Sequence, residues 1–300
     1  MPGHTVDIRD KADLQHDDIM ALNFISAHCP YIFRPHFRCG LRSHIMEVLH
    51  PAAVQMETEG VVTDGMRWYP KPVPLKMLRI FRRRFCSAAE IAEEIRRLRI
   101  IEAYVPGGQL ARSNEFIVHY SGGSGCDLML CGLQEYADGY ELAPWRLEHV
   151  DVMADLYARM AGSANAPADP AVFFERLRSE VGRFVDGIRR MILDAGFVPD
   201  LAGSRNMLMT RDGRVRLVDI NNVSPVHRGE DIYIDDKGYP VCDKSIEALH
   251  LMETHLLMRQ VPEDDPVYRG FLSVSRRGAV RRFEGRFHQN LAASQRASHI

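Results

Sequence analysis

The chain has 300 residues, 46% of them hydrophobic, which is enough apolar material for a large core in one or two domains. Its formal net charge of -2 argues against a dedicated nucleic-acid-binding protein. No apolar run is long enough to span a membrane, and the first residues do not resemble a secretion signal. The six cysteines lack CxxC spacing, as is typical of reduced thiols, so we expect a cytoplasmic protein.

The first part of the chain is rich in expected strands. Residues 37–51 predict two strands joined by a glycine-containing turn, and residues 73–81 predict another strand. Residues 87–108 predict a helix that is terminated by Gly107 and Gly108. Ser87 and Glu90 have the spacing of a capping box, and apolar residues follow at helical intervals.

Further strands follow before the pattern becomes mainly helical. Residues 115–120 and 127–139 predict two strands separated by a glycine-rich turn, and long helices are expected over 171–196 and 244–258. Between these helices, residues 200–222 contain two apolar runs on either side of an Asp-Gly pair, a pattern that predicts a β-hairpin.

Three oxygen-bearing side chains mark the ends of this hairpin. Asp200 precedes it in a loop, Asn206 lies at the start of its first strand, and Asp219 lies at the end of its second strand. Carboxylate and carbonyl oxygens are the ligands that Mg²⁺ prefers. From this segment alone, a magnesium site and a surface hairpin with polar ends are both open.

Taken in chain order, these features resemble the protein-kinase-like superfamily over roughly residues 37–257. The resemblance implies an α+β, bilobal fold, with a strand-rich N-lobe that contains one long helix and a mainly helical C-lobe. It implies an N-terminal extension over 1–34, the nucleotide-binding N-lobe over 35–139, and the C-lobe with the catalytic loop and metal site over 140–300.

In the N-lobe, "VPLKMLRIF" resembles the strand that anchors the phosphates of ATP in this family. By this resemblance Lys76 would contact the phosphates, and Glu94 in the following helix would pair with it. Lys71 is a weaker alternative to Lys76, and Glu90 and Glu93 are weaker alternatives to Glu94.

The adenine and phosphate loops have less distinctive sequences. The segment "LMLCGLQEYADG" resembles the family's hinge, where the backbone around three residues would bind adenine: Gln134, Glu135 and Tyr136. No intact GxGxxG motif precedes the strand with the lysine. The preferred phosphate loop contains Gly40 and Ser43, with Gly60 and Gly65 as the alternative, because close backbone approach to phosphate favours small residues.

In the C-lobe, Asp200, Asn206 and Asp219 resemble the catalytic loop and the metal-binding aspartate of the family. Asp200 would orient the acceptor hydroxyl, while Asn206 and Asp219 would hold the Mg²⁺ that bridges the ATP phosphates. Three features depart from the family pattern. Val-Pro precedes Asp200, one extra residue separates Asp200 from Asn206, and Ile-Asn-Asn follows Asp219, so Asn221 or Asn222 offers a further oxygen.

The resemblance implies an ATP- and Mg²⁺-dependent phosphotransferase whose acceptor, a small molecule or a restricted protein target, the sequence does not identify. The departures also leave open a pseudokinase-like regulatory module that binds nucleotide weakly or not at all. ATP-grasp ligases are the competing resemblance, because Asp219 and Asn221 fit their acidic residue followed two positions later by asparagine.

Overall fold

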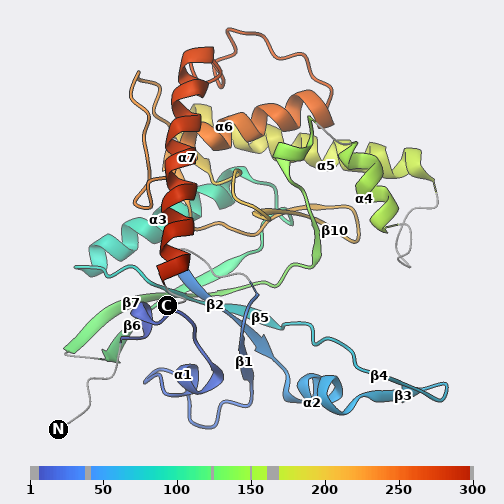
Figure 1. The fold of residues 1–300 in the computed structure, drawn as a ribbon, viewed down its shortest axis with the longest axis vertical. Coiled ribbons are helices and arrows are strands. Elements are labelled where there is room, and N and C mark those ends of the chain that lie inside the picture. Colours follow the sequence, from blue (N-terminus) through green and yellow to red (C-terminus); the bar gives the residue numbers. More distant parts are fainter. Residues whose placement is uncertain (1–6, 38–41, 123–124, 149–150, 161–168, 298–300) are drawn as a thin grey trace. The chain divides into compact units, whose positions relative to one another are not determined.

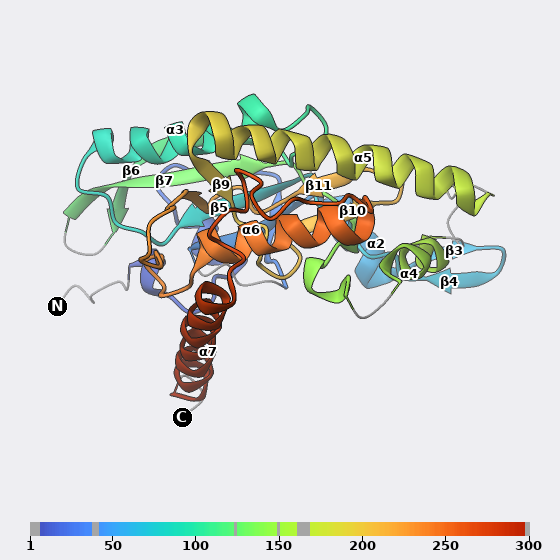
Figure 2. The same ribbon diagram turned by 90° about the horizontal axis from the view of Figure 1, so that it is seen from above.

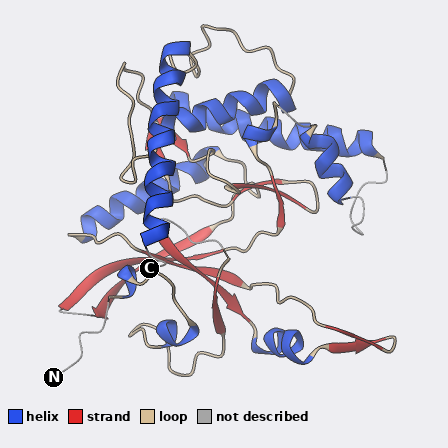
Figure 3. Ribbon diagram, viewed as in Figure 1, coloured by secondary structure: helices blue, strands red, loops and turns tan. Residues whose placement is uncertain are grey.

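The computed structural model describes residues 7–37, 42–122, 125–148, 151–160 and 169–297. These residues form a mixed α+β protein with a five-stranded antiparallel sheet and seven α-helices (Figure 3), so the predicted α+β class is confirmed. The chain divides into two compact units. The first comprises Met1–Arg96 and Ala111–Tyr136, and the second comprises Arg97–Leu110 and Ala137–Ile300.

The first unit is built on the five-stranded sheet (Figure 1), in the order β1-β2-β5-β7-β6 with every neighbouring pair antiparallel. Only β1 and β6 form edges, which leaves β5 in the centre of the sheet. The strands are β1 (Ile32–Pro35), β2 (Ser43–Leu49), β5 (Lys76–Phe81), β6 (Ser113–Gly122) and β7 (Gly125–Gln134).

The two faces of this sheet have different partners. Apolar side chains of β2, β5 and β7 on one face pack with the N-terminal segment, which includes η1 (Ile8–Asp10) and α1 (His16–Met20). On the other face, Phe81 and Leu130 pack with Ile91 of the helix that follows β5. Alternating strand residues therefore belong to two separate cores.

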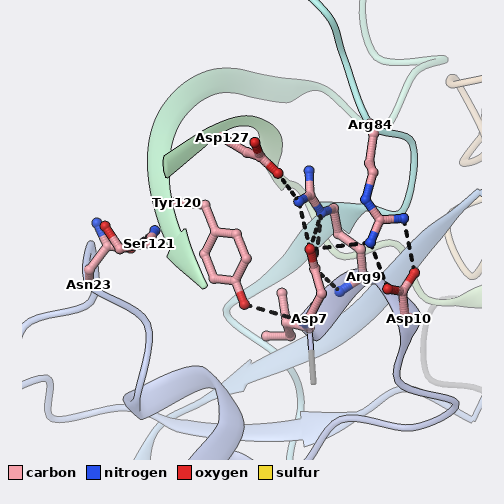
Figure 4. A network of polar contacts seen from close by, with 9 residues as sticks. Asp7, Arg9, Asp10, Asn23, Arg84, Tyr120, Ser121 and Asp127 are labelled. Atoms are coloured by element: carbon pink, nitrogen blue, oxygen red, sulfur yellow. Dashed lines mark hydrogen bonds and ion pairs between the residues drawn. The ribbon is translucent and has the colours of Figure 1, made fainter. Parts of the chain in front are cut away.

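The N-terminal segment is joined to the β6–β7 hairpin by a buried arginine (Figure 4). The side chain of Arg9 is 1% exposed, forms ion pairs with Asp7 and Asp127, and lies over the ring of Tyr120. Burial by itself would raise the pKa of Asp7, but hydrogen bonds and charge from Arg9 outweigh it and lower that pKa. Ile8 is also buried in this core, so the described part of the expected N-terminal extension, from residue 7 onward, packs into the first core.

Helix α3 (Ala88–Tyr104) matches the helix predicted from the capping box. The Ser87 hydroxyl oxygen accepts a hydrogen bond from the Glu90 N–H at 3.2 Å, and the Glu90 carboxylate accepts one from the Cys86 N–H at 2.9 Å. The first contact satisfies an N–H group of the first helical turn, and the second bonds the residue before Ser87 to the helix.

A helix and a hairpin that the sequence did not reveal are inserted between β2 and β5. Helix α2 (Pro51–Glu59) has no fully buried residue, and every residue of β3 (Val61–Thr63) and β4 (Met66–Trp68) is exposed. The turn uses Asp64 and Gly65 at φ angles of 52° and 77°, a conformation in which Asp and Gly are favoured.

The second unit contains most of the helices (Figure 2). The buried side chains of α5 recur at helical spacing and form the centre of a large core, which also includes α6 and part of α3. None of the helices among the described residues has the length and apolar character needed to cross a membrane. The helices and their π-helical continuations are α4 (Val152–Met160), α5 (Pro170–Arg190), η3 (Met191–Ala195), α6 (Val241–Leu251), η4 (Met252–Leu256) and α7 (Val274–Ala297).

Two small sheets complete the second unit. The predicted hairpin is confirmed as β10 (Met207–Thr210) and β11 (Val215–Leu217), and β8 (Gly139–Glu141) pairs with the other edge of β10. Strand β9 (Phe197–Pro199) pairs with β12 (Val223–Pro225). Together these pairings fix the loops that precede β10 and follow β11.

Candidate functional site

Strand pairing in the second unit gathers the polar residues that the sequence singled out. Pro199 at the end of β9 pairs with Val223 at the start of β12, so the next residues, Asp200 and Asn222, also meet. The Asp200 N–H donates a hydrogen bond to the Asn222 carbonyl at 2.8 Å. The β10–β11 hairpin adds Asn206, whose carbonyl accepts a hydrogen bond from the N–H of the residue before Asp219 at 2.8 Å.

The carboxylate of Asp200 accepts three hydrogen bonds. One oxygen accepts from the N–H groups of Ala202 and Gly203 at 3.0 and 3.1 Å, and the other accepts from the Asn222 side-chain amide at 3.1 Å. Asp200 is 8% exposed. It therefore stabilises a tight turn in the way that aspartate often does in loops.

Asp200 and Asp219 lie near enough for their charges to interact. Burial and, to a smaller extent, the negative charge of Asp219 raise the pKa of Asp200, and the hydrogen bonds from Gly203, Ala202 and Asn222 lower it. The net effect is a pKa of about 6. Because two neighbouring carboxylates repel each other when both are ionised, a cation bound beside them would be stabilised.

Asn206 is held close to the Asp200 turn. Its side-chain amide donates a hydrogen bond to the Asp200 carbonyl at 3.0 Å, and the residue is 7% exposed. Gly203 permits this position, because a Cβ atom there would lie 2.4 Å from the Asn206 Nδ2 atom. Glu141 of β8 supports the same loop by accepting hydrogen bonds from the Ser204 hydroxyl and the Arg205 N–H.

The segment after β11 presents two further oxygen donors. Asp219 is half-buried and accepts a hydrogen bond from the Asn221 N–H at 3.2 Å. Asn221 is 7% exposed, and its side-chain oxygen is buried without a hydrogen-bond partner among the described residues. A buried carbonyl oxygen without a partner, two residues after a half-buried carboxylate, is the kind of donor that a hard cation such as Mg²⁺ binds.

The donor set is poor in charged ligands. Among the described residues, no three His, Cys, Asp or Glu side chains come together in a group able to hold a metal ion. A cation here would be held by Asp219 with amide oxygens from Asn206 and Asn221. Mg²⁺ commonly uses only one or two protein carboxylates, with substrate phosphates and water completing its coordination, so this set is compatible with it.

Two distant residues support the Asp200 turn, and no local sequence pattern marks them. The Ser245 hydroxyl oxygen in α6 accepts a hydrogen bond from the Leu201 N–H at 3.1 Å. Trp145, in the short helix η2 (Pro144–Arg146), donates from its indole N–H to the Ala202 carbonyl at 3.0 Å. These contacts depend on the tertiary fold, which places both side chains beside the turn.

In the first unit, the expected ion pair between Lys76 and Glu94 is not formed. Lys76 lies opposite Val48 in the sheet, and Val48 faces the core formed with the N-terminal segment. Directly opposed residues of antiparallel strands share a face, so the sheet separates Lys76 from α3. Glu94 instead contacts Arg83, at 3.5 Å between the side-chain nitrogen and oxygen.

The basic residue of β5 on the α3 side is Arg79, which sequence reasoning missed. It is 1% exposed, and its guanidinium donates a hydrogen bond to the Gln134 side-chain oxygen at 3.2 Å. Strand alternation is the signal that reveals it. Arg79 is two residues from Phe81, which belongs to the core with α3, so the two share a face, whereas Lys76, three residues from Arg79, faces the opposite way.

Among the described residues, the others expected to contact nucleotide are not gathered around one site. Gly40 lies outside the described residues, and Ser43 is buried at the start of β2. The Gln134 side-chain amide donates to the Ala111 carbonyl at 3.0 Å. The Glu135 N–H donates to the Arg112 carbonyl at 2.8 Å, so this backbone donor is used within the first unit.

The remaining hinge residue, Tyr136, is half-buried at the end of the first unit. Of the alternative phosphate loop, Gly60 directly precedes β3 and Gly65 lies in the turn of the exposed β3–β4 hairpin. Of all the residues expected to bind nucleotide or metal, the structure therefore gathers Asp200, Asn206 and Asp219 into one cluster.

A scan against models of known protein families finds no match, and a search of curated proteins finds no similar sequence.

Proposed function

We propose that the chain is an ATP- and Mg²⁺-dependent phosphotransferase with a bilobal, protein-kinase-like fold. The observation that carries this proposal is the convergence of Asp200, Asn206 and Asp219 in the second unit, together with the orphaned side-chain oxygen of Asn221, whose N–H bonds to Asp219. This is the set of side-chain types, in chain order, that phosphotransferases of this class use around their metal.

The first unit supports the proposal through its arrangement of elements. The resemblance implies a strand-rich N-lobe with one long helix. The first unit is rich in strands and includes α3 as far as Arg96, while the rest of this helix belongs to the second unit. Helix α3 follows β5, and β7 ends at Gln134 where the expected hinge begins. Lys76 is not supported as the phosphate-binding cation, because it faces away from α3.

Each residue of the second-unit cluster has a chemical role in this proposal. A bound Mg²⁺ would neutralise phosphate charge and orient the transferred group. Asp219, Asn206 and Asn221 would hold it through their oxygens. Asp200 would accept the proton of the acceptor hydroxyl at a carboxylate oxygen, and a pKa of about 6 suits a group that takes up and releases protons near neutral pH.

A second candidate function is nucleotide binding without phosphate transfer, as in a pseudokinase-like regulatory module. The specific observation that favours it is the engagement of the Asp200 carboxylate by three donors, from Ala202, Gly203 and Asn222. A carboxylate engaged by three donors is well suited to hold a turn, and it leaves about one of its four acceptor positions for a further contact. For the phosphotransferase, the nature of the acceptor is open.

Thermal unfolding with and without ligands tests the proposal. Unfolding is followed with ATP alone, MgCl₂ alone and both together, and γ-phosphate release is measured in the same samples. A ligand at one hundred times its dissociation constant stabilises the folded state by about 2.7 kcal/mol, so nucleotide binding should raise the melting temperature clearly. Stabilisation only by the combination, with phosphate release, supports a phosphotransferase. Stabilisation without release supports the binding module, and no stabilisation contradicts both.

A further inference from the structure

Glu284 in the C-terminal helix α7 contacts two side chains that lead to the Asp200 turn. Its carboxylate accepts a hydrogen bond from the Tyr239 hydroxyl at 3.1 Å and forms an ion pair with Lys244 at 3.2 Å. In both ribbon views α7 lies beside α6, the helix that contains Lys244 (Figures 1 and 2). The same carboxylate thus holds one partner from the segment before α6 and one from α6 itself.

The first connection passes through Lys244 and Trp145. The Lys244 side chain is 7% exposed, and its ammonium nitrogen lies 3.8 Å from the centre of the Trp145 ring. The indole N–H of Trp145 donates to the Ala202 carbonyl, and the Ala202 N–H donates to the Asp200 carboxylate. A cation held over the aromatic face favours one position of the ring, and thereby one position of the turn.

The second connection passes through Tyr239. Its ring packs edge-on against Phe287 of α7, with 5.0 Å between ring centres. Burial raises the pKa of Tyr239, and the negative charges of Glu284 and Asp200 raise it further. Tyr239 is therefore near enough to Asp200 for the two groups to interact electrostatically, while its hydroxyl is bonded to α7.

Helix α7 has an attachment that does not depend on Glu284. Arg276 forms a buried ion pair with Asp243, at 2.5 Å between side-chain nitrogen and oxygen, and donates to the His227 carbonyl at 3.0 Å. A substitution at Glu284 should therefore leave the start of α7 in place. This makes a local effect on the Asp200 turn separable from loss of the helix.

We propose that Glu284 is a positioning residue for the Asp200 turn, so that the placement of α7 governs the geometry of the candidate site. Without the Glu284 charge, Lys244 keeps the ion pair with Glu247, at 2.9 Å, but its ammonium is less firmly held over Trp145. The indole and the Ala202 carbonyl then separate more readily. The inference rests on the proposed function only for its consequence on phosphate transfer.

Two measurements without nucleotide test this coupling. In a Trp68→Phe background Trp145 is the only tryptophan, because the chain contains two. In that background, Glu284→Gln should shift the emission of Trp145. It should also accelerate hydrogen exchange of the amides of residues 201–203 about tenfold, the change expected when a partly buried cation–π contact is lost. Amides in the centre of α5 should exchange at the parent rate.

The matched control is Glu263→Gln, which neutralises an exposed glutamate of the same unit and should leave both signals unchanged. Lys244→Met breaks the same connection without leaving a buried cation unpaired, and it should reproduce the local signature even if the Glu284 variant folds poorly. Unchanged emission and exchange in folded Glu284→Gln, or in Lys244→Met if the former is unfolded, would overturn the proposal. Uniformly faster exchange throughout the second unit would also overturn it, since that indicates a merely structural role. Neither result depends on ATP turnover, so failure of the proposed function is recognised separately.

Discussion

Replacing Asp200 by asparagine should change the stability of the protein in a pH-dependent way. The folded state raises the pKa of Asp200 from its ordinary value of 3.8 to about 6, mainly because the carboxyl is buried. The folded protein therefore binds this proton more tightly than the unfolded chain does. The corresponding stability is fully present below pH 3.8 and is lost as the pH rises through about 6.

The magnitude follows from the same values. The full difference in pKa corresponds to about 3 kcal/mol, and roughly 1.5 kcal/mol of it is lost between pH 5 and pH 8. The asparagine of the variant would not titrate. Its oxygen still accepts from Ala202 and Gly203, while its amide meets the Asn222 amide donor, at a cost of about 1 kcal/mol for one lost hydrogen bond. The unfolding free energy of the variant, relative to that of the parent, should thus rise by about 1.5 kcal/mol between about pH 5 and pH 8.

Urea unfolding of both proteins at several pH values, in EDTA to remove divalent cations, measures this difference. Asp231→Asn, which replaces an exposed aspartate of the same unit, is the matched control. If the unfolding free energy of Asp200→Asn minus that of the parent stays constant with pH, or decreases as pH rises, the assignment of Asp200 as a buried carboxylate repelled by Asp219 is refuted.

Three other substitutions test separate parts of the structure. Gly203→Ala should cost about 1–3 kcal/mol in unfolding free energy, because the new Cβ would lie 2.4 Å from the Asn206 amide nitrogen. The control Gly229→Ala places its Cβ within 4 Å of no other atom and should be neutral. Equal melting temperatures of the two variants would contradict the close packing of Gly203 against Asn206. Arg9→Met should destabilise the protein by about 3 kcal/mol, since it leaves the partners of a buried ion pair without their cation, and a parent-like urea midpoint would show that the N-terminal segment is not anchored there. Lys76→Ala should leave ATP affinity unchanged by titration calorimetry, because the sheet separates Lys76 from α3; weaker binding would place the phosphates on the face that Lys76 occupies.

Elements whose signals are local could be predicted from the sequence. The capping box and helical periodicity after Ser87 gave α3, and the Asp-Gly pair between two apolar runs gave the β10–β11 hairpin. The exposed β3–β4 hairpin was missed, although it also turns at an Asp-Gly pair, because its three-residue strands are too short for a clear alternation.

The candidate site was predictable only in part. The order and spacing of Asp200, Asn206 and Asp219 are visible in the sequence, and strand pairing does bring them together. The sequence does not show which groups occupy the Asp200 carboxylate, because Asn222 reaches it only through the pairing of β9 with β12. Likewise the face of Lys76 depends on the register of β5, and a shift of one residue reverses it.

The most direct test of the Asp200–Asn206–Asp219 cluster is titration calorimetry of ATP into the protein, with MgCl₂ and with EDTA, for the parent and for folded Asp219→Ala. Asp231→Ala again serves as the exposed control. If the cluster holds a metal–nucleotide complex, the parent and the control bind ATP only with Mg²⁺. Asp219→Ala should then lose this binding, because the phosphate charge is no longer compensated by a metal held at the loop. Equal Mg²⁺-dependent affinity in Asp219→Ala and the parent, or no binding by the parent, would contradict the account.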